Sequence, residues 1–146
     1  SCIQGEGQPP HELLLVAVAC AASGRVHEVP VQRLREDDAI DELNLCEKCI
    51  GVTGATLLAF MLPAATSVRS LDLYCNMLCG INPYTGEGTY TAEGITKLCE
   101  GLKGSAVTSL NLASNQLCGL HEYGHGTYTA EGITKLCKAL KGSAVT

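Results

Sequence analysis

Apolar residues follow two alternating patterns along this chain. In the first, leucines stand at every second position over a short stretch, as at Leu71 and Leu73 or at Leu110 and Leu112. This is the period of a strand with one buried face. In the second, which follows each time, apolar residues return every three or four positions, as on one side of a helix. The alternation predicts strand–helix units, and therefore an α/β fold with a parallel sheet.

The predicted units repeat nearly the same sequence. Residues 88–108 recur as residues 126–146 with two substitutions, a similarity that indicates duplication. Each copy follows a leucine-containing phrase, and a variant of this phrase lies 28 residues before the first of them. Three strand units are therefore expected. Their phrases contain Ile40, Leu43, Leu45, Lys48 and Ile50; Val68, Leu71, Leu73, Asn76 and Leu78; and Val107, Leu110, Leu112, Asn115 and Leu117.

Asn76 and Asn115 occupy the position at which the backbone turns away from the strand. An amide side chain at such a turn satisfies main-chain groups that have no partner in the sheet, so a structural role is expected for both. Lys48 stands at the same position in the first unit. It marks that unit as irregular, as terminal repeats usually are.

The ends of the predicted helices are marked by capping residues. Thr91 and Thr129 are expected N-caps, each followed two residues later by a glutamate in the first turn, and a lysine–glycine pair closes each helix. The helix of the first unit is expected over residues 53–62, since Pro63 ends it, and an earlier helix over residues 11–22.

Together these elements predict an α/β solenoid, with a curved parallel sheet inside and helices outside. Residues 1–39 form the N-terminal segment with its capping helix, and residues 40–146 form three units, 40–67, 68–106 and 107–146. A single unit buries too little apolar surface to be stable alone. Because the last unit stops where a further strand would begin, the array is expected to be truncated there or covered by another chain.

The leucine phrase resembles the leucine-rich repeat of the ribonuclease-inhibitor-like class, which is shared by ribonuclease inhibitors, Ran GTPase-activating proteins and the sensor ends of NOD-like receptors. The resemblance covers residues 40–146, and the phrase GTYTAEGITKLC is also similar to large repeat families of single-celled algae. It implies a non-catalytic protein-binding scaffold or an accessory subunit of a larger assembly. A regulator of an enzyme or GTPase is the alternative, although no counterpart of the GTPase activators' catalytic arginine is identifiable.

Two surfaces of such a scaffold are candidates for protein binding, and the first is the strand face. Residues between the inward leucines point to this face, and they are small, polar and slightly acidic. Such a surface suits a basic or neutral partner, while a solvated face without a partner would look the same. The strand-face residues are Glu42, Asn44, Ser70, Asp72, Tyr74, Ser109, Asn111 and Ala113.

The second candidate surface is formed by two loops inserted between strand and helix. Both carry tyrosines, which offer the flat aromatic area with a polar tip that dominates protein interfaces. Equivalent tyrosines are expected side by side in adjacent units, where they either bind a partner or pack on the neighbouring loop. They are Tyr84 and Tyr90 in residues 82–90, and Tyr123 and Tyr128 in residues 121–128.

One of these loops contains the sequence H-E-x-x-H, from His121 to His125. On a helix this spacing binds zinc, with the glutamate as the base of a hydrolase. Glycines surround the sequence here, and the sister loop contains no histidine. A zinc-binding hydrolase is therefore a remote alternative, and neither a metal, a cofactor nor catalysis is expected.

Four cysteines, Cys46, Cys49, Cys75 and Cys79, have a spacing that also suits four thiolate ligands of a structural zinc. The repeat argues against this site, because Cys79 recurs in the next unit as Cys118, and the helix cysteines 99 and 137 correspond in the same way. We expect the repeated cysteines to be small buried hydrophobic residues copied with the unit.

Composition narrows the partners and the compartment. A net charge of −5 without a cluster of lysine and arginine argues against nucleic acid and anionic membranes as targets. The apolar run at residues 13–22 is about half the length of a membrane span. The odd number of cysteines, nine, and the absence of an N-glycosylation sequence favour a reducing intracellular compartment, either cytoplasm or an organelle interior.

Overall fold

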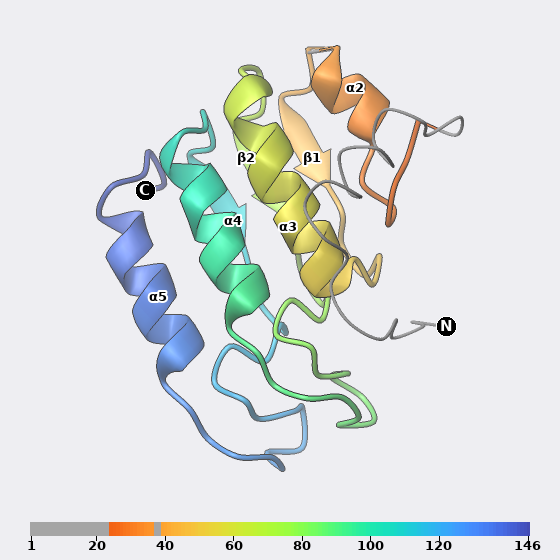
Figure 1. The fold of residues 1–146 in the computed structure, drawn as a ribbon, viewed down its shortest axis with the longest axis vertical. Coiled ribbons are helices and arrows are strands. Elements are labelled where there is room, and N and C mark those ends of the chain that lie inside the picture. The colour runs from red at the N-terminus through yellow and green to blue at the C-terminus, as the bar shows by residue number, and fades with distance from the viewer. Residues whose placement is uncertain (1–23, 37–38) are drawn as a thin grey trace.

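The computed structural model describes residues 24–36 and 39–146, and it shows a mixed α/β fold (Figure 1). The helix expected over residues 11–22 lies outside the described residues. Within them, no helix is long and apolar enough to cross a membrane.

Three short strands form an open parallel sheet in the order β1-β2-β3. Leu71 pairs with Leu43 on one side and with Leu110 on the other, so the three leucine phrases lie in register. Of the leucines that flank this pairing, Leu45 and Leu73 are fully buried behind the sheet, and Leu112 is half-buried. The strands are β1 (Glu42–Asn44), β2 (Ser70–Asp72) and β3 (Ser109–Asn111).

A helix follows each strand, and the three helices lie side by side on one face of the sheet (Figure 1). The apolar core lies between this helix layer and the leucines of the strands. A short helix that the sequence pattern did not predict, α2, precedes β1 and buries Val31 and Leu34. The helices are α2 (Val31–Arg35), α3 (Gly51–Met61), α4 (Glu93–Lys103) and α5 (Glu131–Leu140), and the 3₁₀ turn η1 (Leu62–Ala64) follows α3.

The helix ends differ slightly from those expected. Helix α3 begins two residues before residue 53, and Pro63 lies in η1. The N-caps of α4 and α5 are alanines 92 and 130, one residue after the predicted threonines. The hydroxyls of Thr91 and Thr129 still accept the first free N–H groups, from Glu93 at 3.1 Å and Glu131 at 3.2 Å. The capping chemistry is therefore present, one position earlier than a standard N-cap.

The turn after each strand has the same unusual backbone in all three units. Two non-glycine residues, separated by one residue, adopt positive φ angles between 52° and 58°. This left-handed region costs energy for residues with a side chain, so other contacts must hold the turn in place. The residues are Glu47 and Cys49, Cys75 and Met77, and Ser114 and Gln116.

The two asparagines of the leucine phrases hold these turns, each from the following unit. The Asn76 Oδ1 accepts from the backbone N–H groups of Lys48 at 3.1 Å and Ile50 at 3.3 Å. The Asn115 Oδ1 accepts in the same way from Asn76 at 3.0 Å and Leu78 at 3.2 Å. Each asparagine thus serves the preceding unit. This explains the lysine of the first unit, because no strand precedes β1 in the part of the chain that the structure describes.

Candidate functional site

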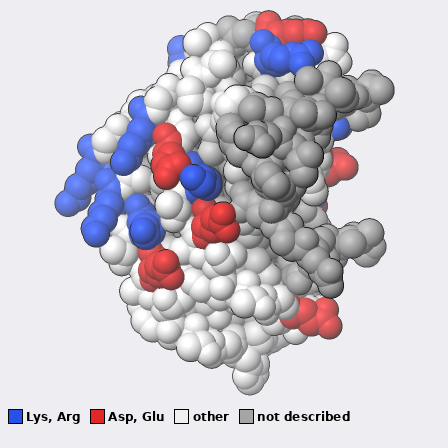
Figure 2. All heavy atoms as spheres, viewed as in Figure 1, with Lys and Arg blue, Asp and Glu red and all other residues white. Residues whose placement is uncertain are grey.

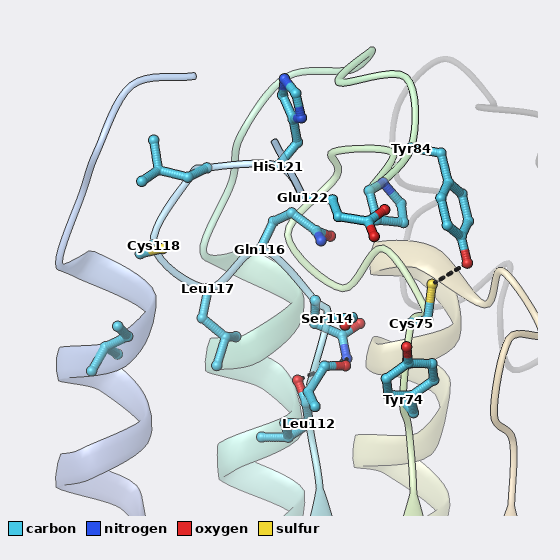
Figure 3. Close-up of a pocket in the computed structure, with 15 residues that line it drawn as sticks. Tyr74, Cys75, Tyr84, Leu112, Ser114, Gln116, Leu117, Cys118, His121 and Glu122 are labelled. Carbon is cyan, nitrogen blue, oxygen red and sulfur yellow. Dashed lines mark hydrogen bonds between the residues drawn. The ribbon is translucent and has the colours of Figure 1, made fainter. Parts of the chain in front are cut away.

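A cavity of about 350 Å³ opens where the chain leaves β2 and β3 (Figure 3). Its walls come from the turns after these two strands, from the inserted loops, and from Ile133 of α5. The same edge of the sheet carries both groups of tyrosines expected from the sequence. The cavity and the loops around it are therefore the candidate site.

The two inserted loops are small hairpins that touch one another. Isolated bridges close them, between Ile81 and Gly88 in one and between Leu120 and Gly126 in the other. The backbone N–H of Glu122 donates to the carbonyl of the buried Pro83 at 3.2 Å, which joins the second hairpin to the first. The hairpins thus form one continuous surface.

Three tyrosines of these hairpins are exposed over more than half of their surface: Tyr84, Tyr123 and Tyr128. The Cys75 thiol and the Tyr84 hydroxyl are hydrogen-bonded at 3.4 Å, and this contact is the main reason why the pKa of Tyr84 is raised to about 12. Tyr84 therefore presents a neutral ring fixed against the turn after β2.

Tyr90 has a different environment from the other three tyrosines. Its hydroxyl donates to the carbonyl of Leu117 at 3.1 Å and accepts from the N–H of Gly132 at 3.0 Å. Burial is the main cause that raises the pKa of Tyr90. This hydroxyl therefore joins the second unit to the third and is already occupied within the fold.

The strand face has a local reason for much of its polarity. Asn44, Asp72 and Asn111 occupy equivalent positions, and each side chain accepts from the backbone N–H two residues further along, at 2.9, 2.9 and 3.1 Å. Such turns are a common use of these residue types. Polarity at these three positions therefore does not by itself indicate a partner. The other strand-face candidates are exposed or half-buried; they are Glu42, Ser70, Tyr74, Ser109 and Ala113.

Gln116 was not among the residues expected to bind anything. It lines the cavity, its side chain is only 8% exposed, and its buried Oε1 has no hydrogen-bond partner in the described part of the chain. A signal was present in the repeat, because the equivalent residues are Cys49 and Met77. The third unit thus places an amide where the others carry sulfur side chains.

The H-E-x-x-H sequence lies in the second hairpin and not on a helix. The rings of His121 and His125 are 5.3 Å apart between centroids, and the backbone N–H of His121 donates to the carbonyl of His125 at 3.0 Å. The Nδ1 of His121 accepts from the N–H of Tyr123 at 3.2 Å. Among the residues that the structure describes, no three histidine, cysteine or acidic side chains are grouped to hold a metal.

The repeated cysteines have different environments in the two copies. Cys79 and Cys99 are buried, and burial raises the pKa of the Cys79 thiol to about 12. Their counterparts are half-buried at Cys118 and exposed at Cys137. The expectation that all four are buried is therefore wrong for Cys137, because no further helix covers α5 within the described residues.

Cys49 forms a disulfide, whereas the cysteines at 46, 75 and 79 are free thiols. The four residues therefore do not act together as thiolate ligands. A disulfide is also not what a uniformly reducing compartment predicts.

Charge is unevenly distributed over the molecule. Basic side chains gather on the helix layer, over α4 and α5 (Figure 2), where glutamates stand among them. The cavity is lined by Glu122 and by no lysine or arginine. The lysines of the helix layer are Lys97, Lys103, Lys135, Lys138 and Lys141.

No protein-family model matches the chain, and no curated protein and no solved structure matches it either.

Proposed function

We propose that this chain is a short solenoid of leucine-rich repeats of the ribonuclease-inhibitor-like class, and that it is a non-catalytic scaffold that binds a protein partner within a larger assembly. The repeated leucine phrases support the first part, because β1, β2 and β3 pair in the same register. The shared turn geometry and the asparagines that link successive units agree with this architecture.

The observation that carries the binding role is the exposed aromatic surface of the joined hairpins. Tyr84 and Tyr123 present large rings to solvent on hairpins that are bonded to one another, and Tyr128, which follows the second hairpin, is exposed as well. Aromatic rings on a rigid support lose little conformational entropy on binding, which is why such residues contribute strongly to interfaces. The alternatives of a GTPase regulator and a zinc hydrolase have no comparable support in the described residues.

Site-specific photo-crosslinking tests this proposal. A photoreactive phenylalanine analogue replaces Tyr123 in one variant and Lys138, on α5, in a matched variant. Each protein is irradiated in an extract of its source cells, and covalent adducts are identified by mass spectrometry. We expect a defined protein adduct from position 123 and none from position 138. The same adduct from both positions, or none from position 123, contradicts the proposed surface.

Tyr90 is left unchanged in this experiment, because its hydroxyl bonds to Leu117 and Gly132. A substitution there would alter the packing of the third unit together with any binding surface. The thermal unfolding of each variant, followed by circular dichroism, shows whether the fold is retained.

A further inference from the structure

The cavity between the hairpins contains an acceptor that the described chain leaves unsatisfied. The Oε1 of Gln116 is buried from solvent and accepts no hydrogen bond. Buried polar atoms in proteins nearly always have a partner, so an orphaned one at a cavity wall calls for an explanation. A donor brought by a ligand provides that explanation.

A second acceptor lines the same cavity. Figure 3 shows the side chains of Gln116 and Glu122 extending into the same space between the turns. The backbone bond from Glu122 to Pro83 fixes the position from which the carboxylate projects. A ligand that reaches Gln116 therefore passes a negative charge, and its preferred donor is cationic.

The remaining walls suit a flat cation on an apolar stem. Tyr74 and Tyr84 provide aromatic rings, and Pro83 and Leu117 provide aliphatic surface. No lysine or arginine lines the cavity. Glu47, whose charge acts on Tyr84, lines a neighbouring pocket that shares Pro83 and Tyr84 with this cavity. An arginine side chain has these properties: its guanidinium is planar, offers five N–H donors and stacks on aromatic rings, while its stem packs on apolar surface.

We propose that this cavity receives the guanidinium group of an arginine side chain presented by a protein partner. The inference rests on the proposed scaffold function and adds the chemistry of one contact. In the complex, the Gln116 Oε1 and the Glu122 carboxylate accept from the guanidinium, which lies against the tyrosine rings. The Glu122 carboxylate repels a carboxylate or phosphate at the same place.

A peptide titration measures this contact without knowledge of the partner. The full chain, labelled with ¹⁵N, is titrated with acetyl-Gly-Arg-Gly-amide, and with the matched peptide in which citrulline replaces arginine. Citrulline has the same shape and no charge. We expect the arginine peptide to shift the side-chain amide signals of Gln116 with weak, saturable affinity, and the citrulline peptide to bind at least about tenfold less tightly.

Two variants assign the binding to the cavity. Gln116→Met removes the acceptor and has a precedent in the chain, since Met77 is buried at the equivalent position of the second unit. Glu122→Gln removes the charge. Each substitution is expected to lower the affinity for the arginine peptide by about fivefold or more. The control is Glu87→Gln, on the other hairpin and outside the cavity, which is expected to leave the affinity unchanged.

Equal affinity for the two peptides, or an affinity that both cavity variants leave unchanged, overturns the proposal. Binding of methylguanidinium as tight as that of the peptide overturns the assignment to a polypeptide. The two proposals fail separately. If Tyr123 cross-links a partner and the peptide does not bind, the cavity inference is wrong. If the peptide binds as expected and Tyr123 cross-links nothing, the proposed tyrosine surface of the hairpins is wrong and the cavity contact stands.

Discussion

Residues 88–108 and 126–146 are almost the same sequence, yet they occupy different environments. Ile95 of α4 is fully buried, while its copy Ile133 of α5 is 40% exposed. The reason is position: α4 lies between α3 and α5, whereas α5 has a helix neighbour on one side only within the described chain (Figure 1). The burial of a helix residue in this fold therefore depends on the unit that follows it.

Other positions are equally buried in both units. Asn76 and Asn115 are 0% and 1% exposed, although the second belongs to the third unit, which no further unit covers within the described chain. Both asparagines face the unit before them, and each has such a neighbour. The comparison separates two kinds of position. Those packed against the preceding unit are buried in both copies, and those packed against the following unit are buried in the second unit but exposed in the third unit of the described chain.

One of the two substitutions between the copies follows from this packing. A Cβ at Gly101 would collide with the backbone of Ala59, so α4 approaches α3 too closely for any side chain there. The equivalent residue of α5 is Ala139, which is buried. The contact of α5 with the rest of the molecule thus has room for a methyl group where that of α4 has none.

The largest expected difference comes from truncating the equivalent isoleucines. Ile95→Ala should reduce the free energy of unfolding by about 2–5 kcal/mol, because it removes fully buried methyl groups and leaves a void. Ile133→Ala should cost less than about 1 kcal/mol, since that side chain is already partly solvated. Urea unfolding followed by circular dichroism measures both. Equal losses would show that Ile133 is covered in solution, and the comparison would fail.

Asparagine substitutions should give the opposite result, a large effect that is the same in both units. Asn76→Ala and Asn115→Ala each leave two N–H groups of the preceding turn without an acceptor, at a cost of about 2–4 kcal/mol. The same unfolding assay compares them, and Asn44→Ala is the control, because its side chain bonds only within its own exposed turn. A much smaller loss of stability for Asn115→Ala than for Asn76→Ala would refute the view that each asparagine holds the turn of the unit before it.

The smallest effect is expected from removing one oxygen atom. Tyr90→Phe should destabilise the fold by about 1 kcal/mol, because the hydroxyl bridges Leu117 and Gly132. Tyr128→Phe, in the equivalent and exposed position, should leave stability unchanged. Thermal unfolding of the matched pair tests this prediction. Identical melting curves would show that the bridge made by the Tyr90 hydroxyl does not stabilise the packing of the units.

Much of the fold is predictable from short-range patterns. Alternating leucines predict strands, because successive side chains of a strand point to opposite faces, and the duplicated phrase predicts that the strands are equivalent. The register of Leu43, Leu71 and Leu110 agrees with that prediction. Helix α2 was missed, since a helix of five residues has too few turns to produce a periodic pattern.

The candidate site was predictable only in part. The tyrosines of the inserted loops are visible in the sequence as aromatic residues among glycines. Gln116 is not, because a glutamine in a turn is ordinarily solvated, and its burial depends on hairpins that are distant from it along the chain. The different environments of Tyr90 and Tyr128 are likewise invisible, since the two residues have the same neighbours in sequence.

The sequence by itself determined much of the local geometry of this protein: the three strands, the helix that follows each of them, and the face of the sheet to which the strand leucines point. These properties depend on backbone preferences and on side-chain periods that each copy of the repeat carries. Only the tertiary structure decided the environment of equivalent residues in the two copies. Whether an isoleucine is buried, an asparagine serves a neighbouring turn or a glutamine lines a cavity depends on the unit stacked beside it, because solvent exclusion and hydrogen bonding are completed between units.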